Sequence, residues 1–175
     1  IREPESAGSV PPLAYGPDAR ARLDSAVLRI VKTSDLRAAL RLRDTCLGLA
    51  GSQDDRQVRA FWKISAGFFD ALGHGLLSAD IYVKRVASRV LLQYATLAKG
   101  DIAISDRLLQ DLLFFCAQAV PVETHPGDVP TALIAVRQGF ALDRFEPVAY
   151  ETAQFGRFDP SVLAQARKRI ASATE

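Results

Sequence analysis

The chain has 175 residues, of which 49% are hydrophobic and 24% are charged, and its net charge is +2. This composition indicates a globular domain with a hydrophobic core and excludes extended disorder. The charges are nearly balanced and mixed along the chain, which argues against a nucleic-acid-binding protein, because such a protein usually carries a basic stripe.

The cellular setting follows from what the sequence lacks. No apolar run is long enough to span a bilayer, and the first residues do not form a signal peptide. Cys46 and Cys116 lie inside apolar helical patterns, which predicts small buried core residues in a reducing compartment rather than a disulfide framework or a zinc site. The chain contains no methionine. This absence predicts that the chain is a segment of a longer protein. The cysteine pattern and the missing signal peptide predict that this protein is cytoplasmic.

Residues 1–17 contain four prolines together with glycine and serine, which predicts a flexible linker or arm. Residues 18–175 are predicted to form a single helical domain. Capping and helix-ending residues divide this part of the chain into helices. They are Pro17, Asp35, Gly51, Asp54 or Asp55, Gly73, Ser78, Gly100 and Ser105.

Apolar residues recur at helical spacing between these boundaries. The helix that begins near Ser105 is apolar on two adjacent stripes, so we expect it at the centre of the bundle. After a loop at 120–130 comes a sixth helix, then an irregular strap at 145–158 rich in aromatic residues, and a last helix at 159–174. No strand-like alternation occurs. The sequence therefore predicts an all-α fold, an antiparallel bundle of about six to seven helices.

The two histidines are the candidates for phosphate or metal chemistry. His74 lies between two glycines at a helix end, where its charge also suits the helix dipole. His125 lies in a loop rich in proline and glycine, where a solvated side chain is the simpler interpretation. Asp70 and Asp80 could approach His74 in space. No spacing completes a metal site and no catalytic motif is present, so we expect no metal, no cofactor and no enzyme activity.

Two basic helix faces are candidate docking surfaces for an acidic protein partner, although a solvated face is the simpler interpretation of each. One face carries Lys84, Arg85 and Arg89. The other carries Arg167, Lys168 and Arg169. The aromatic residues around Trp62 indicate core packing rather than a cofactor site.

Several segments of the chain resemble a known family. They are FWKISAGFFDAL at 61–72, VKRV at 83–86, DRLLQDLLFF at 106–115, FGRFDP at 155–160 and LAQARKRI at 163–170. Over roughly residues 55–175 they are similar to the N-terminal region of CheA-type hybrid histidine kinases (ChpA/PilL) of type IV pilus chemosensory systems, and to modules of the related FimL scaffold. The resemblance implies a histidine-phosphotransfer-like (Hpt-like) helical module.

Active modules of this type carry an exposed histidine in mid-helix, followed by lysine three residues later and glycine four residues later. In this chain Leu77 and Ser78 stand at those positions after His74, and Asp128 and Val129 after His125. The resemblance therefore implies a degenerate, non-catalytic docking module whose parent protein is a histidine kinase.

The expected partners are response-regulator receivers, scaffold proteins of the pilus pole or a second copy of the chain, and neither nucleic acid nor membrane. Two alternatives stay open. One is an active phosphotransfer domain that uses His74, and the other is an unrelated helical ligand-binding protein.

Overall fold

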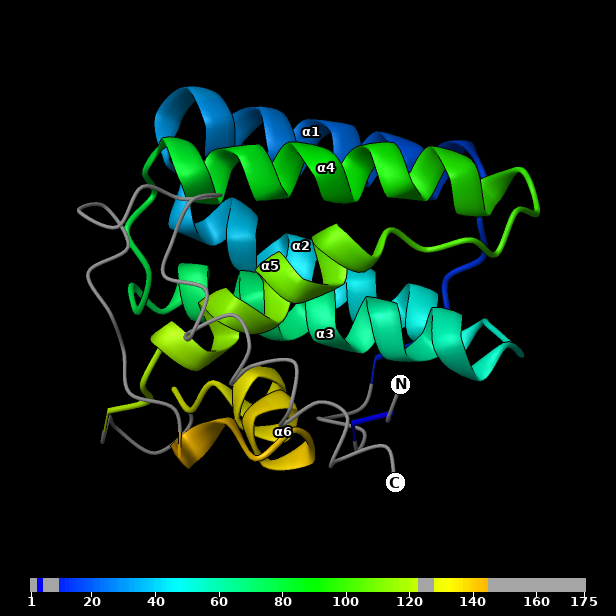
Figure 1. Ribbon diagram of the computed structural model, residues 1–175. Coiled ribbons are helices and arrows are strands. Elements are labelled where there is room, and N and C mark those ends of the chain that lie inside the picture. Colours follow the sequence, from blue (N-terminus) through cyan, green and yellow to red (C-terminus); the bar gives the residue numbers. More distant parts are fainter. Residues whose placement is uncertain (1–2, 5–9, 123–127, 145–175) are drawn as a thin grey trace.

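The computed structural model describes residues 3–4, 10–122 and 128–144, and within these ranges it contains helices and no strand (Figure 1). The all-α fold predicted from the sequence is confirmed. The predicted strap at 145–158, the last helix at 159–174, His125 and the second basic face (Arg167, Lys168 and Arg169) lie outside the described residues. The helices are α1 (Pro17–Thr33), α2 (Leu36–Gly51), α3 (Arg56–Gly73), α4 (Ile81–Ala98), α5 (Asp106–Gln118) and α6 (Thr131–Gly139), followed by the 3-10 turn η1 (Leu142–Arg144).

Side-chain caps set most of the helix starts. The carboxylates of Asp35 and Asp55 accept hydrogen bonds from backbone N–H groups in the first turns of α2 and α3, and the Ser105 hydroxyl does the same for α5. The prediction of Ser78 as the cap of α4 is wrong. Asp80 immediately precedes this helix and accepts hydrogen bonds from the second and third residues of α4, whereas Ser78 is exposed two residues further out. Asp80 caps the helix because a capping side chain must reach the N–H groups of the first turn, and Ser78 is too far from them.

The helices form layers in which α1 and α4 lie side by side over α2 and α3, with α5 and α6 on the remaining sides of α3 (Figure 1). The direction of the chain reverses at each connection from α1 to α5, as the colour gradient in Figure 1 shows. α3 packs against α2, α5 and α6 and is the most extensively packed helix of the described residues. α5, expected at the centre, packs against α3, α4 and α6 and is itself almost fully buried.

Aromatic side chains fill the core, as the sequence predicts. Trp62 is fully buried and donates a hydrogen bond from Nε1 to the Tyr15 hydroxyl over 3.1 Å. Phe68 and Phe115 bring α3 and α5 together, with ring centroids 5.8 Å apart. The remaining fully buried aromatic side chains are those of Phe61, Phe69 and Phe140. Burial of these rings supplies much of the hydrophobic stabilisation of the bundle.

Arg137 of α6 closes the C-terminal end of α5. Its Nη1 donates hydrogen bonds to the carbonyl oxygens of Cys116, Ala117 and Ala119 over 2.8, 2.8 and 3.2 Å. These carbonyls have no partner further along their own helix, and a cation at this end also suits the helix dipole. Its Nε donates to Asp143 over 3.0 Å. A buried arginine is tolerated here because its donors are satisfied.

The described part of the N-terminal arm lies against the bundle. The Leu13 N–H donates to the Gly48 carbonyl of α2 over 2.8 Å, and the Ser52 hydroxyl donates to the Leu13 carbonyl over 2.7 Å. Glu3 pairs with Arg59 at 3.0 Å and with Lys63 at 2.7 Å. The hydrogen bond from Arg59, supported by Lys63, lowers the pKa of Glu3 to about 2. The flexibility predicted for residues 1–17 stays a prediction.

Candidate functional site

His74, the candidate phospho-acceptor, directly follows the last residue of α3 and is enclosed rather than presented to solvent. Only 9% of its side chain is exposed. Its Nδ1 lies 2.8 Å from the Asp70 backbone oxygen and 3.1 Å from Asp70 Oδ1, and its Nε2 lies 3.2 Å from Asp128 Oδ1. Both ring nitrogens therefore contact oxygen acceptors. A phosphoryl group, which is itself negative, would have to enter between two carboxylates.

Asp70 joins three helices at this place. Its fully buried carboxylate accepts hydrogen bonds from Arg43 Nη1 of α2 over 2.9 Å and from the Leu133 N–H of α6 over 3.1 Å. The residue before α6 is Pro130, whose side chain makes no capping bond, so Asp70 supplies from α3 the acceptor that α6 lacks locally. The predicted approach of Asp70 to His74 is thus present, whereas Asp80 caps α4.

The three residues of the predicted basic face of α4 have different surroundings in the structure. Arg89 Nη1 lies 2.6 Å from Asp111 Oδ2, and the Asp111 side chain is only 2% exposed, so this pair fastens α4 to α5. Arg85 is exposed and Lys84 is half-buried, and within the described part of the chain neither forms an ion pair. Arg85 and Lys84 therefore remain accessible to a partner, while Arg89 is committed to the fold.

Two large apolar side chains flank Arg85 on the same side of α4. Ile81 is 62% exposed and Leu92 is 69% exposed. Ile81, Arg85, Ser88 and Leu92 follow one another at i, i+4, i+7 and i+11, the spacing of a single helix face. We call these four residues the α4 stripe. An exposed cation between two exposed apolar side chains makes this face a candidate protein contact surface.

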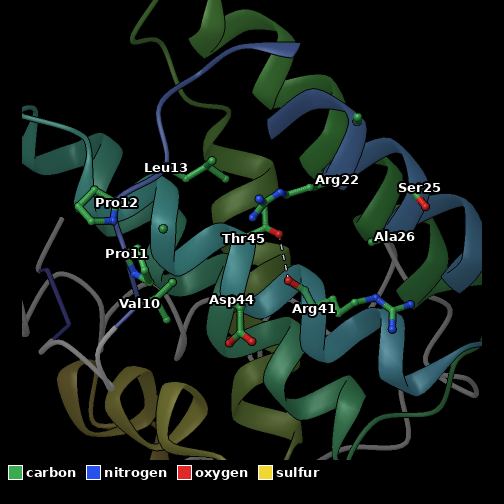
Figure 2. A pocket seen from close by; sticks show the side chains of 12 residues that line it. Val10, Pro11, Pro12, Leu13, Arg22, Ser25, Ala26, Arg41, Asp44 and Thr45 are labelled. Carbon is green, nitrogen blue, oxygen red and sulfur yellow. Dashed lines mark hydrogen bonds between the residues drawn. The ribbon is translucent and has the colours of Figure 1, made fainter. Parts of the chain in front are cut away.

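A groove of about 720 Å³ lies between the arm, α1 and α2 (Figure 2). Two arginines line it, Arg22 from α1 and Arg41 from α2, together with Asp44. The sequence did not reveal this groove, because one of its walls is the arm. Its other lining residues are small or apolar: Val10, Pro11, Pro12, Leu13, Ala21, Ser25, Ala26, Thr45 and Gly48.

Other kinds of site find little support in the described residues. Within them, no group of three or more histidine, cysteine, aspartate or glutamate side chains could hold a metal ion. Burial raises the pKa of the Cys46 and Cys116 thiols well above their usual range, which disfavours the reactive thiolate. None of the helices described is both long and apolar enough to cross a membrane.

Of the comparisons with known proteins, one identifies a family. No curated protein matches the chain, and no solved structure does. The family described as FimL scaffold protein second domain matches residues 9–153, a range that takes in part of the arm, all six described helices, the α4 stripe and the groove. The match begins well before the region of resemblance at 55–175. The chain therefore belongs to the family of FimL scaffold protein second domains.

Proposed function

We propose that this domain is a non-catalytic docking module of a scaffold that works in type IV pilus chemosensory signalling. The observation that carries the proposal is its membership of the FimL scaffold second-domain family over residues 9–153. A scaffold domain acts by presenting stable surfaces to other proteins, and a rigid helical bundle suits that task. The module works in the cytoplasm, in an assembly with receiver domains or with scaffold proteins of the pilus pole.

The surroundings of His74 support a degenerate Hpt-like bundle, one that has kept the helices and lost the acceptor. An active acceptor needs a ring nitrogen open to the receiver and a cation nearby to hold the phosphate. Here Asp70 and Asp128 occupy the two ring nitrogens at 3.1 and 3.2 Å. Two kinds of full-length protein could contain this domain, a CheA-type kinase or a separate FimL-like scaffold. The flanking sequence distinguishes them, because a kinase would carry kinase and receiver domains there.

The α4 stripe is the docking surface of this proposal. A receiver or scaffold that carries a carboxylate beside an apolar patch would pair with Arg85 and cover Ile81 and Leu92. Burying the two apolar side chains would stabilise the complex, while the ion pair would orient the partner.

A binding assay with the system's own proteins tests the proposal. Each purified receiver and pole scaffold is titrated against the domain by calorimetry, and then against Arg85→Glu and Leu92→Ser. We expect one partner to bind, with the affinity falling about tenfold or more in both variants.

The matched control is Arg56→Glu, which makes the same charge change at the exposed start of α3. It should leave the affinity unchanged. If none of these proteins binds, or if Arg85→Glu and Leu92→Ser bind as tightly as the wild type, the proposal is wrong.

A further inference from the structure

Residues 10–13 of the arm form one wall of the groove and are fixed to the bundle by specific contacts. Leu13 is held to α2 through both its N–H and its carbonyl group. The close approach depends on Gly48, because a Cβ at this position would lie 3.0 Å from the Leu13 Cβ and 3.0 Å from the Pro11 carbonyl oxygen. Pro11 and Pro12 stiffen the same stretch. The groove is therefore preformed, which lowers the entropic cost of filling it.

The groove offers apolar contact and few unsatisfied polar groups of its own. Leu13 and Ala26 contribute apolar surface from the arm and from α1. The Thr45 hydroxyl already donates to the Arg41 carbonyl over 3.0 Å (Figure 2). An apolar side chain entering the groove would thus bury surface without breaking a hydrogen bond of Thr45.

The two arginines that line the groove are only loosely paired. Arg22 reaches Asp18 at 3.1 Å, with both side chains more than half exposed, and Arg41 lies 4.0 Å from Asp35. Exposed pairs of this kind contribute little stability, so a ligand carboxylate can replace the present partners at low cost.

Other charges near the groove leave this positive character intact. Asp44, the acidic lining residue, pairs with its neighbour Arg43 at 2.9 Å. Residues 17–51 carry seven basic and four acidic residues, an excess of three positive charges in a chain whose net charge is +2. The segment that forms α1 and α2, two walls of the groove, therefore carries a net positive charge.

We propose that this groove binds an extended acidic segment of a partner protein, one in which carboxylates flank an apolar side chain. The carboxylates pair with Arg22 and Arg41, whose planar guanidinium groups can hold a carboxylate through two hydrogen bonds. The apolar side chain lies between them, against Leu13 and Ala26. The groove and the α4 stripe are formed by different residues, so substitutions can test the two surfaces separately.

A peptide selection tests this inference. A display library of random decapeptides is selected against the full chain, and the most enriched peptides are then labelled with fluorescein and titrated by anisotropy. We expect sequences in which Asp or Glu alternates with apolar residues. Their affinity should fall about tenfold or more in the double variant Arg22→Gln/Arg41→Gln, since two charge-assisted contacts are lost.

Two further variants complete the test. Ser25 lines the groove from an exposed position on α1, so Ser25→Trp should block binding by filling the groove. Arg56→Gln/Arg107→Gln removes the same net charge at two exposed positions outside the groove and should bind as the wild type does, while circular dichroism verifies that each variant is folded. The inference is overturned if no peptide is enriched, if the enriched peptides are neutral or basic, or if the groove variants bind normally. Receiver binding through the α4 stripe does not enter this test, so the two proposals fail separately.

Discussion

Replacing Asp70 with alanine should uncouple α2, α3 and α6. The substitution removes the acceptor of Arg43 and of the Leu133 N–H. Loss of a partner from a fully buried ion pair costs about 3–5 kcal/mol. The Arg43 side chain is 24% exposed and can regain water, so its share is nearer to about 1–2 kcal/mol. Loss of the helix cap at Leu133 adds about 1 kcal/mol. We therefore expect the free energy of unfolding to fall by about 2–3 kcal/mol.

Urea unfolding followed by tryptophan fluorescence measures this change. Trp62 is the single tryptophan of the chain and is fully buried, so its emission reports the loss of the core. The matched control is Asp24→Ala, which breaks an ion pair with Arg20 whose two side chains are each 48% exposed. This control should cost no more than about 0.5 kcal/mol.

Amide hydrogen exchange locates the effect. In Asp70→Ala the Leu133 N–H should exchange faster, while amides in the middle of α1 should change no more than the global loss of stability requires. A free energy of unfolding within about 0.5 kcal/mol of the wild type, or unchanged exchange at Leu133, would refute the account of Asp70 as the cap of α6.

Substitutions at three other residues, Ser65, Arg137 and Glu3, test further contacts of the structure. The Ser65 hydroxyl is buried with no hydrogen-bond partner in the described part of the chain, so Ser65→Ala should leave stability unchanged or raise it by up to about 1 kcal/mol, measured as a shift of the urea midpoint. Arg137→Met should lower the free energy of unfolding by about 2–4 kcal/mol, and Arg137→Lys by less, in thermal unfolding followed by calorimetry. The pKa of Glu3 is lowered to about 2 from 4.5, chiefly by the Arg59 hydrogen bond. Its contribution to stability is therefore complete above pH 4.5 and is lost as the pH falls towards 2. The stability difference between the wild type and Glu3→Gln should shrink over that interval, and a difference that stays constant would refute the pairing.

Local chemistry explains which features the sequence predicts well. The predicted starts at Asp54 or Asp55 and at Ser105 agree with the structure, because a capping residue acts on the N–H groups of the next turn. The start at Pro17 agrees because proline suits the first turn of a helix, and α3 ends at Gly73 as predicted. The sequence led to Ser78 instead of Asp80 because serine and aspartate cap equally well and lie two positions apart here. Sequence alone does not rank them.

Tertiary contacts explain what the sequence does not predict. Arg89 looks like a solvated residue on a basic face, yet its partner Asp111 comes from another helix, 22 residues further along. Asp70 caps a helix 63 residues away. The groove depends on the arm returning to Gly48, 35 positions beyond Leu13. Such pairings leave no periodic pattern in the sequence.

A phosphotransfer assay with receivers of the pilus chemosensory system tests most directly the proposal that this domain docks a receiver without accepting phosphate. Each receiver of the system is phosphorylated with a radiolabelled donor and mixed with the wild type and with His74→Gln, and both complex formation and label on the domain are recorded. The account predicts that a receiver binds both proteins alike and that neither acquires label, because both ring nitrogens of His74 are occupied. Label on the wild type that is lost in His74→Gln would contradict it.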